Sequence, residues 1–165
     1  MQECIIIASA DKNWGIGYQN SLLARIPEDM KNVSGKTKGN VIVMGRKTLE
    51  SFPGGKPLPD RVNIVLTTNT NFKADGAIIV HSIEELMDEL KKYDKHIYVF
   101  GGESVYRQLL PYCRKAYITR FNKKFLADSH LPCFDELEGW KLVNKGEWQI
   151  SKKGIEYRFD EYIRE

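Results

Sequence analysis

The sequence predicts an α/β fold in which a largely parallel sheet is covered by helices on both faces. Over the first two thirds of the chain, short apolar runs alternate with amphipathic segments of helical spacing. After residue 116 the runs instead alternate in polarity with period two, and Lys153-Gly154 forms a turn between the last two of them. We therefore expect an antiparallel C-terminal hairpin at one edge of the sheet.

The individual elements follow from this alternation. The first strands are expected at Cys4–Ser9, Asn40–Met44, Val62–Thr67, Ala77–Val80 and Ile97–Phe100, and the helices at Pro27–Lys36, Lys47–Phe52, Ile83–Tyr93 and Glu103–Leu110. The third helix has the clearest signals, because Ser82 and Glu85 form a capping box ahead of apolar residues at helical spacing. Pro111 ends the fourth helix. The last runs are expected as strands at Ala116–Phe121, Trp140–Ile150 and Ile155–Ile163.

Length and composition predict one domain, 1–165, that acts as a monomer. Apolar residues make up 42% and charged residues 28%, which is typical of soluble globular proteins. The net charge of +3 comes from interleaved basic and acidic residues, so neither nucleic acid nor a membrane is expected as a partner. The three cysteines form no CxxC pair, and no signal peptide precedes the first apolar run. These features predict a cytoplasmic protein without a metal site.

A glycine pair, Gly101-Gly102, ends one apolar run, and a helix is expected to begin immediately after it. Backbone can approach a ligand closely where side chains are absent, and the next helix start offers unpaired N–H groups. This pattern indicates a phosphate or pyrophosphate site. An ordinary tight turn is the alternative.

The segments that follow two other strands also suit a phosphate. Gly45-Arg46-Lys47-Thr48 places two cations and a hydroxyl at a strand-to-helix junction, although a solvated basic surface is the alternative. Thr67 and Thr68 follow the third strand without a carboxylate, which favours the 2′-phosphate of NADP over NAD. Neither GxGxxG nor the P-loop pattern is present.

The longest irregular stretch expected, 11–26, contains Trp14 and Gly15-Ile16-Gly17. Its length, glycines and large aromatic suit a lid that closes over a ligand. The alternative is a mobile surface loop in which Trp14 packs as an anchor.

Asp29 is the candidate acid. Pro27 opens a helix, and although acids are common in a first turn, Asp29 neighbours an apolar stripe that includes Met30, whereas Glu28 is expected to face water. A carboxylate in an apolar pocket has a raised pKa, and it can pair with an amidine-like ligand edge.

Taken in order, these segments resemble dihydrofolate reductases of the bacterial chromosomal type. The matching pieces are Asp11–Gly17, Ile26–Met30, Val41–Thr48, Pro57–Arg61, Asn63–Thr68, Val99–Tyr106, Tyr117–Thr119 and Asp128–Pro132. The resemblance implies an eight-stranded sheet, four helices, and NADPH-dependent reduction of 7,8-dihydrofolate to tetrahydrofolate, by hydride transfer to pterin C6 and protonation at N5.

The resemblance also implies roles for particular residues. Asp29 would pair with the 2-amino/N3 edge of the pterin, backed by Thr119, and Arg61 would pair with the α-carboxylate of the glutamate tail. The other substrate-binding residues would be Ile7, Met30, Val33, Leu58 and Phe100. The cofactor would be lined by Ala8, Ile16, Gly17, Gly45, Arg46, Lys47, Thr48, Leu66, Thr67, Thr68, His81, Phe100, Gly101, Gly102, Glu103, Ser104, Val105 and Tyr106. The Gly101–Gly102 bond would be a cis peptide.

The chain departs from the family pattern where aromatic residues usually enclose the folate. Ala24 replaces a tryptophan, and Val33 and Leu131 replace phenylalanines. We therefore expect a roomier folate pocket, with Trp14 supplying part of the missing bulk. Gly54-Gly55-Lys56 lengthens the loop near the benzoyl-glutamate end.

Three other functions remain open at this point. A reductase of the same fold could act on a pyrimidine intermediate of riboflavin synthesis, although Asp29 and Arg61 argue against it. A protein could bind NADP without catalysis. A basic RNA-binding module would need stacking aromatics among its cations, and the sequence lacks them there.

Overall fold

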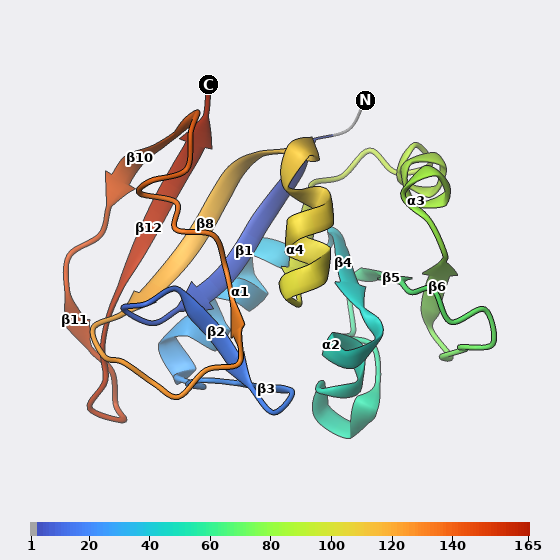
Figure 1. Ribbon diagram of the computed structural model, residues 1–165. Coiled ribbons are helices and arrows are strands. Elements are labelled where there is room, and N and C mark those ends of the chain that lie inside the picture. The colour runs from blue at the N-terminus through green and yellow to red at the C-terminus, as the bar shows by residue number, and fades with distance from the viewer. Residues whose placement is uncertain (1–2) are drawn as a thin grey trace.

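A mainly parallel sheet runs through the molecule, and helices cover both of its faces (Figure 1). The computed structural model describes residues 3–165. The strands of this sheet are β1 (Cys4–Ala10), β4 (Val41–Gly45), β5 (Val62–Leu66), β6 (Ala77–Val80), β7 (Ile97–Gly101), β8 (Cys113–Phe121), β10 (Trp140–Lys145), β11 (Gln149–Ile150) and β12 (Glu156–Arg164). Eight of them follow the order β10-β12-β8-β1-β7-β4-β5-β6, and β11 pairs with β12. The predicted eight-stranded sheet is confirmed.

Strand direction reverses twice across this order, on the two sides of β12. The strands from β8 to β6 pair in parallel, whereas β12 pairs antiparallel with β8, β10 and β11. The C-terminal antiparallel edge is therefore confirmed. Lys153 and Gly154 lie in the turn between β11 and β12, as predicted, and Gly154 has a φ of +80°.

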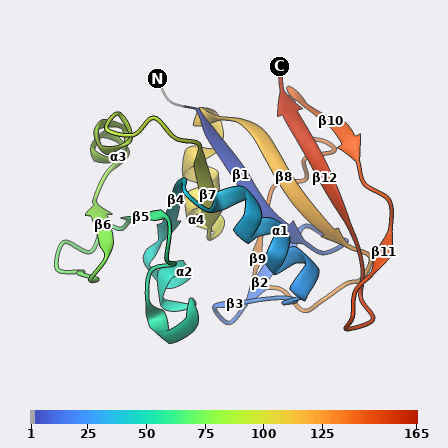
Figure 2. The ribbon, with the colours of Figure 1, turned by 180° about the vertical axis from the view of Figure 1, so that it is seen from behind.

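The two helices nearest the centre of the sheet cover opposite faces. Figure 1 shows α4 (Glu103–Leu109) on the near side of the sheet, and Figure 2, seen from behind, shows α1 (Pro27–Thr37) on the near side. The remaining helices are α2 (Arg46–Glu50), α3 (Ile83–Leu90) and the short 3-10 turns η1 (Pro53–Gly55) and η2 (Leu110–Tyr112). The four predicted helices are present, although α3 ends three residues earlier than expected.

Strand side chains alternate between the two faces, so each central strand contributes to two apolar cores. Val43 packs in the cluster that contains Tyr106 of α4, whereas its neighbour Met44 packs in the cluster that Val33 of α1 borders. Because both faces are covered, the parallel strands are apolar throughout rather than in alternation. This is why they were recognisable as continuous apolar runs.

The segment 11–26 is not the irregular loop that was predicted. It contains β2 (Gly15–Tyr18) and β3 (Ser21–Leu22), which form a separate sheet, here called the small sheet, with β9 (Ser129–His130) in the order β3-β2-β9. The prediction was wrong because the partner strand β9 comes from the far part of the chain. Asp11 shapes the entry to β2, since its Oδ1 accepts the N–H groups of Asn13 and Gly15 at 2.8 Å each.

Two strand boundaries also differ. β8 begins at Cys113 rather than Ala116, because Cys113 already pairs with Cys4 of β1. The predicted strand Trp140–Ile150 is divided into β10 and β11, and between them the N–H of Gly146 donates to Asp160 Oδ1 at 3.1 Å instead of continuing the ladder. Within residues 3–165 no helix is long and apolar enough to cross a membrane. The single domain 1–165 stays a prediction, and residues 1 and 2 lie outside the described part.

Candidate active site

A buried carboxylate, that of Asp29, lies between the first turn of α1 and the last part of β8. Pro27 opens the helix, as predicted, and Asp29 follows in the first turn with only 4% of its surface exposed. The Oγ1 of Thr119 donates a hydrogen bond of 2.6 Å to Asp29 Oδ1. Because Thr119 pairs with Ser9 near the carboxyl end of β1, the carboxylate lies at the edge where parallel sheets bind ligands.

The environment of Asp29 favours its neutral form. Burial raises the pKa of Asp29 from 3.8 to about 6, and the hydrogen bond from Thr119 opposes part of this rise. Among the described residues no hydrogen bond occupies Asp29 Oδ2. The carboxylate therefore keeps acceptor capacity for a ligand with two adjacent N–H donors, which would compensate the cost of its burial.

This pKa shift predicts a pH-dependent stability. Between about pH 4 and pH 6 the folded protein holds the Asp29 proton more tightly than the unfolded chain, so the free energy of unfolding falls as the pH rises. The loss is about 2–3 kcal/mol by pH 7, and it is absent below pH 4. Urea unfolding of the wild type and Asp29→Asn at pH 4 and pH 7 measures it. A difference between the two proteins that stays constant with pH would contradict the shift.

The glycine pair at the end of β7 is packed against α4. Gly101 has a φ of +98°, the Gly101–Gly102 peptide is cis as predicted, and a Cβ on Gly101 would lie 2.5 Å from the ring of Tyr106. The buried Tyr106 hydroxyl donates to the Ile7 carbonyl at 2.8 Å, which fixes the ring against the middle of β1. Only glycine therefore allows the backbone of β7 to pass this close to Tyr106.

Arg61 is held at the carboxyl end of α1. Its Nε donates to Thr37 Oγ1 at 2.9 Å, one terminal nitrogen donates to Ser34 Oγ at 2.9 Å, and the other donates to the Pro59 carbonyl at 2.6 Å. The nitrogen that binds Ser34 Oγ also donates to the Ser34 carbonyl at 3.3 Å, so among the described contacts one of the five guanidinium N–H donors stays available for a carboxylate. Beside Arg61 and Leu58, an open hollow of about 810 Å³ lies between the loops 55–61 and 72–76.

The predicted cofactor residues gather at the ends of β4, β5 and β6. The register pairs Gly45 with Leu66 and Leu66 with Val80, so the residues that follow each strand lie in one row. In this row a ring nitrogen of His81 lies 2.8 Å from the Thr67 carbonyl. Arg46 pairs with Glu50 one turn further along α2, at 2.9 Å, on the exposed surface.

The structure brings most of the predicted residues to the carboxyl edge of the parallel strands. The adjacent positions are Ile7 and Ala8 of β1, Gly45, Arg46, Lys47 and Thr48 after β4, Leu66, Thr67 and Thr68 after β5, His81 after β6, and Phe100 through Tyr106 at β7 and α4. Ile16 and Gly17 belong to β2 of the small sheet, and Met30 and Val33 to α1.

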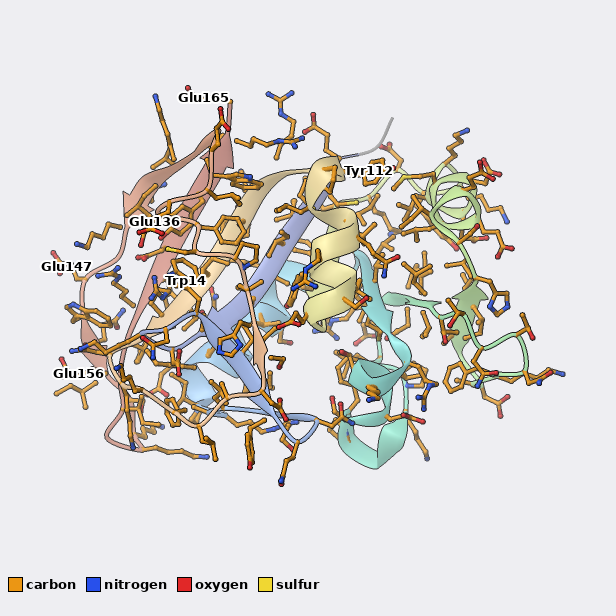
Figure 3. The ribbon with its side chains drawn as sticks, in the orientation of Figure 1. Trp14, Tyr112, Glu136, Glu147, Glu156 and Glu165 are labelled. Carbon is orange, nitrogen blue, oxygen red and sulfur yellow. The ribbon has the colours of Figure 1, made fainter. Side chains whose placement is uncertain are left out.

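Two expectations about side-chain direction were wrong. Trp14, labelled in Figure 3, does not add bulk near Asp29. It stacks on the guanidinium of Arg120 at 3.8 Å and packs in the cluster that contains Tyr106 of α4. Glu28 is half-buried rather than turned to water, since its Oε2 accepts the N–H of Lys152 at 3.0 Å. The roomier folate pocket stays a prediction.

Sequence reasoning assigned no role to the residues that hold the small sheet in place. Asp128 Oδ2 accepts the N–H of Gln19 at 2.9 Å, and Asp11 Oδ2 accepts that of Phe125 at the same distance. The Arg120 guanidinium donates to the Asp11 carbonyl at 3.1 Å. Asp11 and Asp128 lie within segments that match the family pattern, but no local spacing signal pairs residues so far apart.

Comparison with known proteins agrees with this geometry. A family model described as dihydrofolate reductase matches residues 3–164. The chain belongs to the dihydrofolate reductase family. Among curated relatives, the dihydrofolate reductase of Staphylococcus aureus is 34% identical over 160 residues, covering 96% of each chain. That of Staphylococcus haemolyticus is 37% identical over 161 residues, covering 96% of this chain and 94% of the relative.

A solved dihydrofolate reductase has the same fold. The enzyme from Enterococcus faecalis, complexed with NADP(H) and RAB-propyl, superposes with a TM-score of 0.87 at 30% identity, covering 98% of this chain and 96% of the other. The resemblance noted from the sequence is thereby confirmed. No finding favours the pyrimidine reductase of riboflavin synthesis as an alternative.

Proposed function

We propose that this dihydrofolate reductase binds dihydrofolate through Asp29 and Arg61 and binds NADPH along the carboxyl ends of β1, β4, β5 and β7. The observation that carries the proposal is the buried Asp29 carboxylate, to which Thr119 donates at 2.6 Å, while no residue of the described part of the chain hydrogen-bonds Oδ2. A pterin presents two adjacent N–H donors on one edge, which matches this acceptor pair. The nicotinamide supplies a hydride to pterin C6 when NADPH is bound.

The residues present fit NADPH. Among the described residues a Cβ on Gly102 would meet only Thr48 Oγ1, at 3.9 Å, so the backbone there is open to close approach. No carboxylate follows β5, where Thr67 and Thr68 instead offer hydroxyls. Arg46 and Lys47 at the start of α2 add positive charge for phosphate groups. The set therefore suits a dinucleotide that carries an additional 2′-phosphate.

In this reaction the protein groups bind and orient the substrate. Asp29 orients the pterin and stabilises positive charge on it, whereas Arg61 fixes the far end of the substrate through its positive charge and its remaining donor. Tyr106 holds the Ile7 carbonyl in a fixed position in the middle of β1. Because Asp29 pairs with the edge remote from N5, the proton for N5 comes through solvent.

We also propose the compartment, the oligomeric state and the partners of this protein. All three cysteines are free thiols, which suits the reducing cytoplasm. We expect a monomer that binds neither nucleic acid nor membrane, because the net charge of +3 is spread over the chain.

A single assay tests the proposal. The purified protein is mixed with NADPH and dihydrofolate, and absorbance at the nicotinamide band is followed. We expect NADPH consumption that needs both the protein and dihydrofolate, and none with the pyrimidine substrate of riboflavin synthesis. NADPH binding without consumption would instead support a non-catalytic NADP-binding protein.

A further inference from the structure

Glu103 connects α4 to the small sheet. It is the first residue of α4, immediately after Gly102, and its Oε1 accepts the N–H of His130 in β9 at 2.6 Å. Its other oxygen lies 3.6 Å from the guanidinium of Arg107, one helical turn later. A carboxylate that accepts a backbone N–H at this distance forms a charge-assisted hydrogen bond, which is stronger than a neutral one.

The contact reaches β2 through β9. Strand register pairs His130 with Gly15 and Ser129 with Gly17, and the N–H of Leu131 donates to the Trp14 carbonyl at 2.8 Å. A change in the position of β9 is therefore transmitted to β2. That strand carries Ile16 and Gly17, which the proposed function places against the cofactor.

Apolar packing and this hydrogen bond together join α4 to the small sheet. Leu131, which follows β9, and Ile16 of β2 are buried in the same cluster as Val105 and Tyr106 of α4. An open hollow of about 300 Å³ lies beside the hydrogen bond, lined by Glu103, Arg107, His130, Leu131 and Pro132. Among residues 3–165, the Glu103–His130 bond is the polar contact between α4 and β9.

A carboxylate at this position has an electrostatic cost. It adjoins the Gly101-Gly102 turn, where the proposed cofactor would bring phosphate charge, and its cationic neighbour Arg107 has a side chain that is 75% exposed and therefore well screened. A residue that only favoured the cofactor by charge would be basic or neutral here. The acid is explained by its hydrogen bond to β9.

We propose that Glu103 is a positioning residue that latches the small sheet to α4 and thereby holds β2 against the bound cofactor. The inference rests on the proposed cofactor-binding edge. Loss of the latch is expected to speed cofactor release, because only apolar packing then holds β2 and β9 to α4.

Three variants separate the latch from charge effects. Glu103→Ala removes the acceptor and the charge, Glu103→Gln keeps an acceptor oxygen without the charge, and Arg107→Gln removes only the surface ion pair. The NADPH dissociation rate is measured by trapping with excess competing nucleotide. We expect an increase of about 10-fold for Glu103→Ala, and changes within about 3-fold for the other two variants. KM for dihydrofolate should stay within about 2-fold in all three.

Amide hydrogen exchange in the cofactor-free protein gives a second measurement. The His130 N–H should exchange faster in Glu103→Ala and keep its protection in Glu103→Gln. An unchanged NADPH dissociation rate together with unchanged His130 amide exchange in Glu103→Ala would overturn the latch. Slower NADPH dissociation in both Glu103 variants would overturn it too, because it would mean that the carboxylate acts by repelling the cofactor. A wild type that does not bind NADPH would refute the proposed function, and the exchange experiment would then decide the latch alone.

Discussion

The Asp29→Asn variant is expected to lose at least about 100-fold in kcat/KM for dihydrofolate at pH 7 while binding NADPH within about 2-fold of the wild type. An asparagine side chain presents one acceptor and two donors, so it cannot accept both N–H groups of a pterin edge. The hydroxyl of Thr119 donates to Asp29 Oδ1 at 2.6 Å, and in the variant it can still donate to the side-chain oxygen of the asparagine. Steady-state kinetics together with NADPH titration measures the two effects separately.

Glu28→Gln is the matched control for this variant. Glu28 is the neighbouring acid in the same helical turn, and glutamine keeps an oxygen for the N–H of Lys152. We expect its kcat/KM within about 3-fold of the wild type. Because burial raises the pKa of Asp29, Asp29→Asn should also be more stable than the wild type at pH 7, so that unfolding cannot explain its inactivity. Turnover close to that of the wild type in Asp29→Asn would remove the carboxylate from the mechanism.

Gly101→Ala is expected to lower the free energy of unfolding by about 2–4 kcal/mol and to weaken NADPH binding about 10-fold or more. Two causes combine at this position. The φ of +98° is strained for any residue with a Cβ, and that Cβ would lie 2.5 Å from the Tyr106 ring. Relief of the contact requires Tyr106 to move, which breaks its 2.8 Å hydrogen bond to the Ile7 carbonyl at the cofactor-binding edge.

Gly154→Ala separates the two causes. Gly154 also has a positive φ, of +80°, but nothing lies within 4 Å of where its Cβ would be. It lies in the turn before β12, and its replacement should cost only about 1 kcal/mol from backbone strain. Urea unfolding of both variants gives the comparison. An equal cost in the two proteins would mean that Tyr106 adapts freely and that its packing does not constrain β7.

Much of the main sheet could be predicted from local patterns. The parallel strands are buried on both faces, so they are continuous apolar runs, and α3 carries its own signal in the bond from Glu85 N–H to Ser82 Oγ. The inward direction of Asp29 also followed from helical spacing, because Pro27 sets the first turn. These features depend on residues close together in the chain.

The small sheet could not be predicted in this way. β2 has only four residues, and its pairing with β9 joins Gly15 to His130, so neither strand has enough local pattern to be recognised. The stacking of Trp14 on Arg120 also joins residues far apart in the sequence, so it could not be predicted. This contact places Trp14 away from the substrate side. A side chain that binds a partner from a distant segment gives no periodic signal.

Local patterns in the amino-acid sequence predicted the order of strands and helices in the main sheet, the chemistry available at the ends of those strands, and the membership of a reductase family. Only the tertiary structure decided which face Trp14 occupies, that Glu28 binds the turn before β12, and that Glu103 joins α4 to β9. The physical reason is that local order comes from backbone periodicity and capping, whereas these contacts form only when the packed sheet brings separate segments within hydrogen-bonding distance.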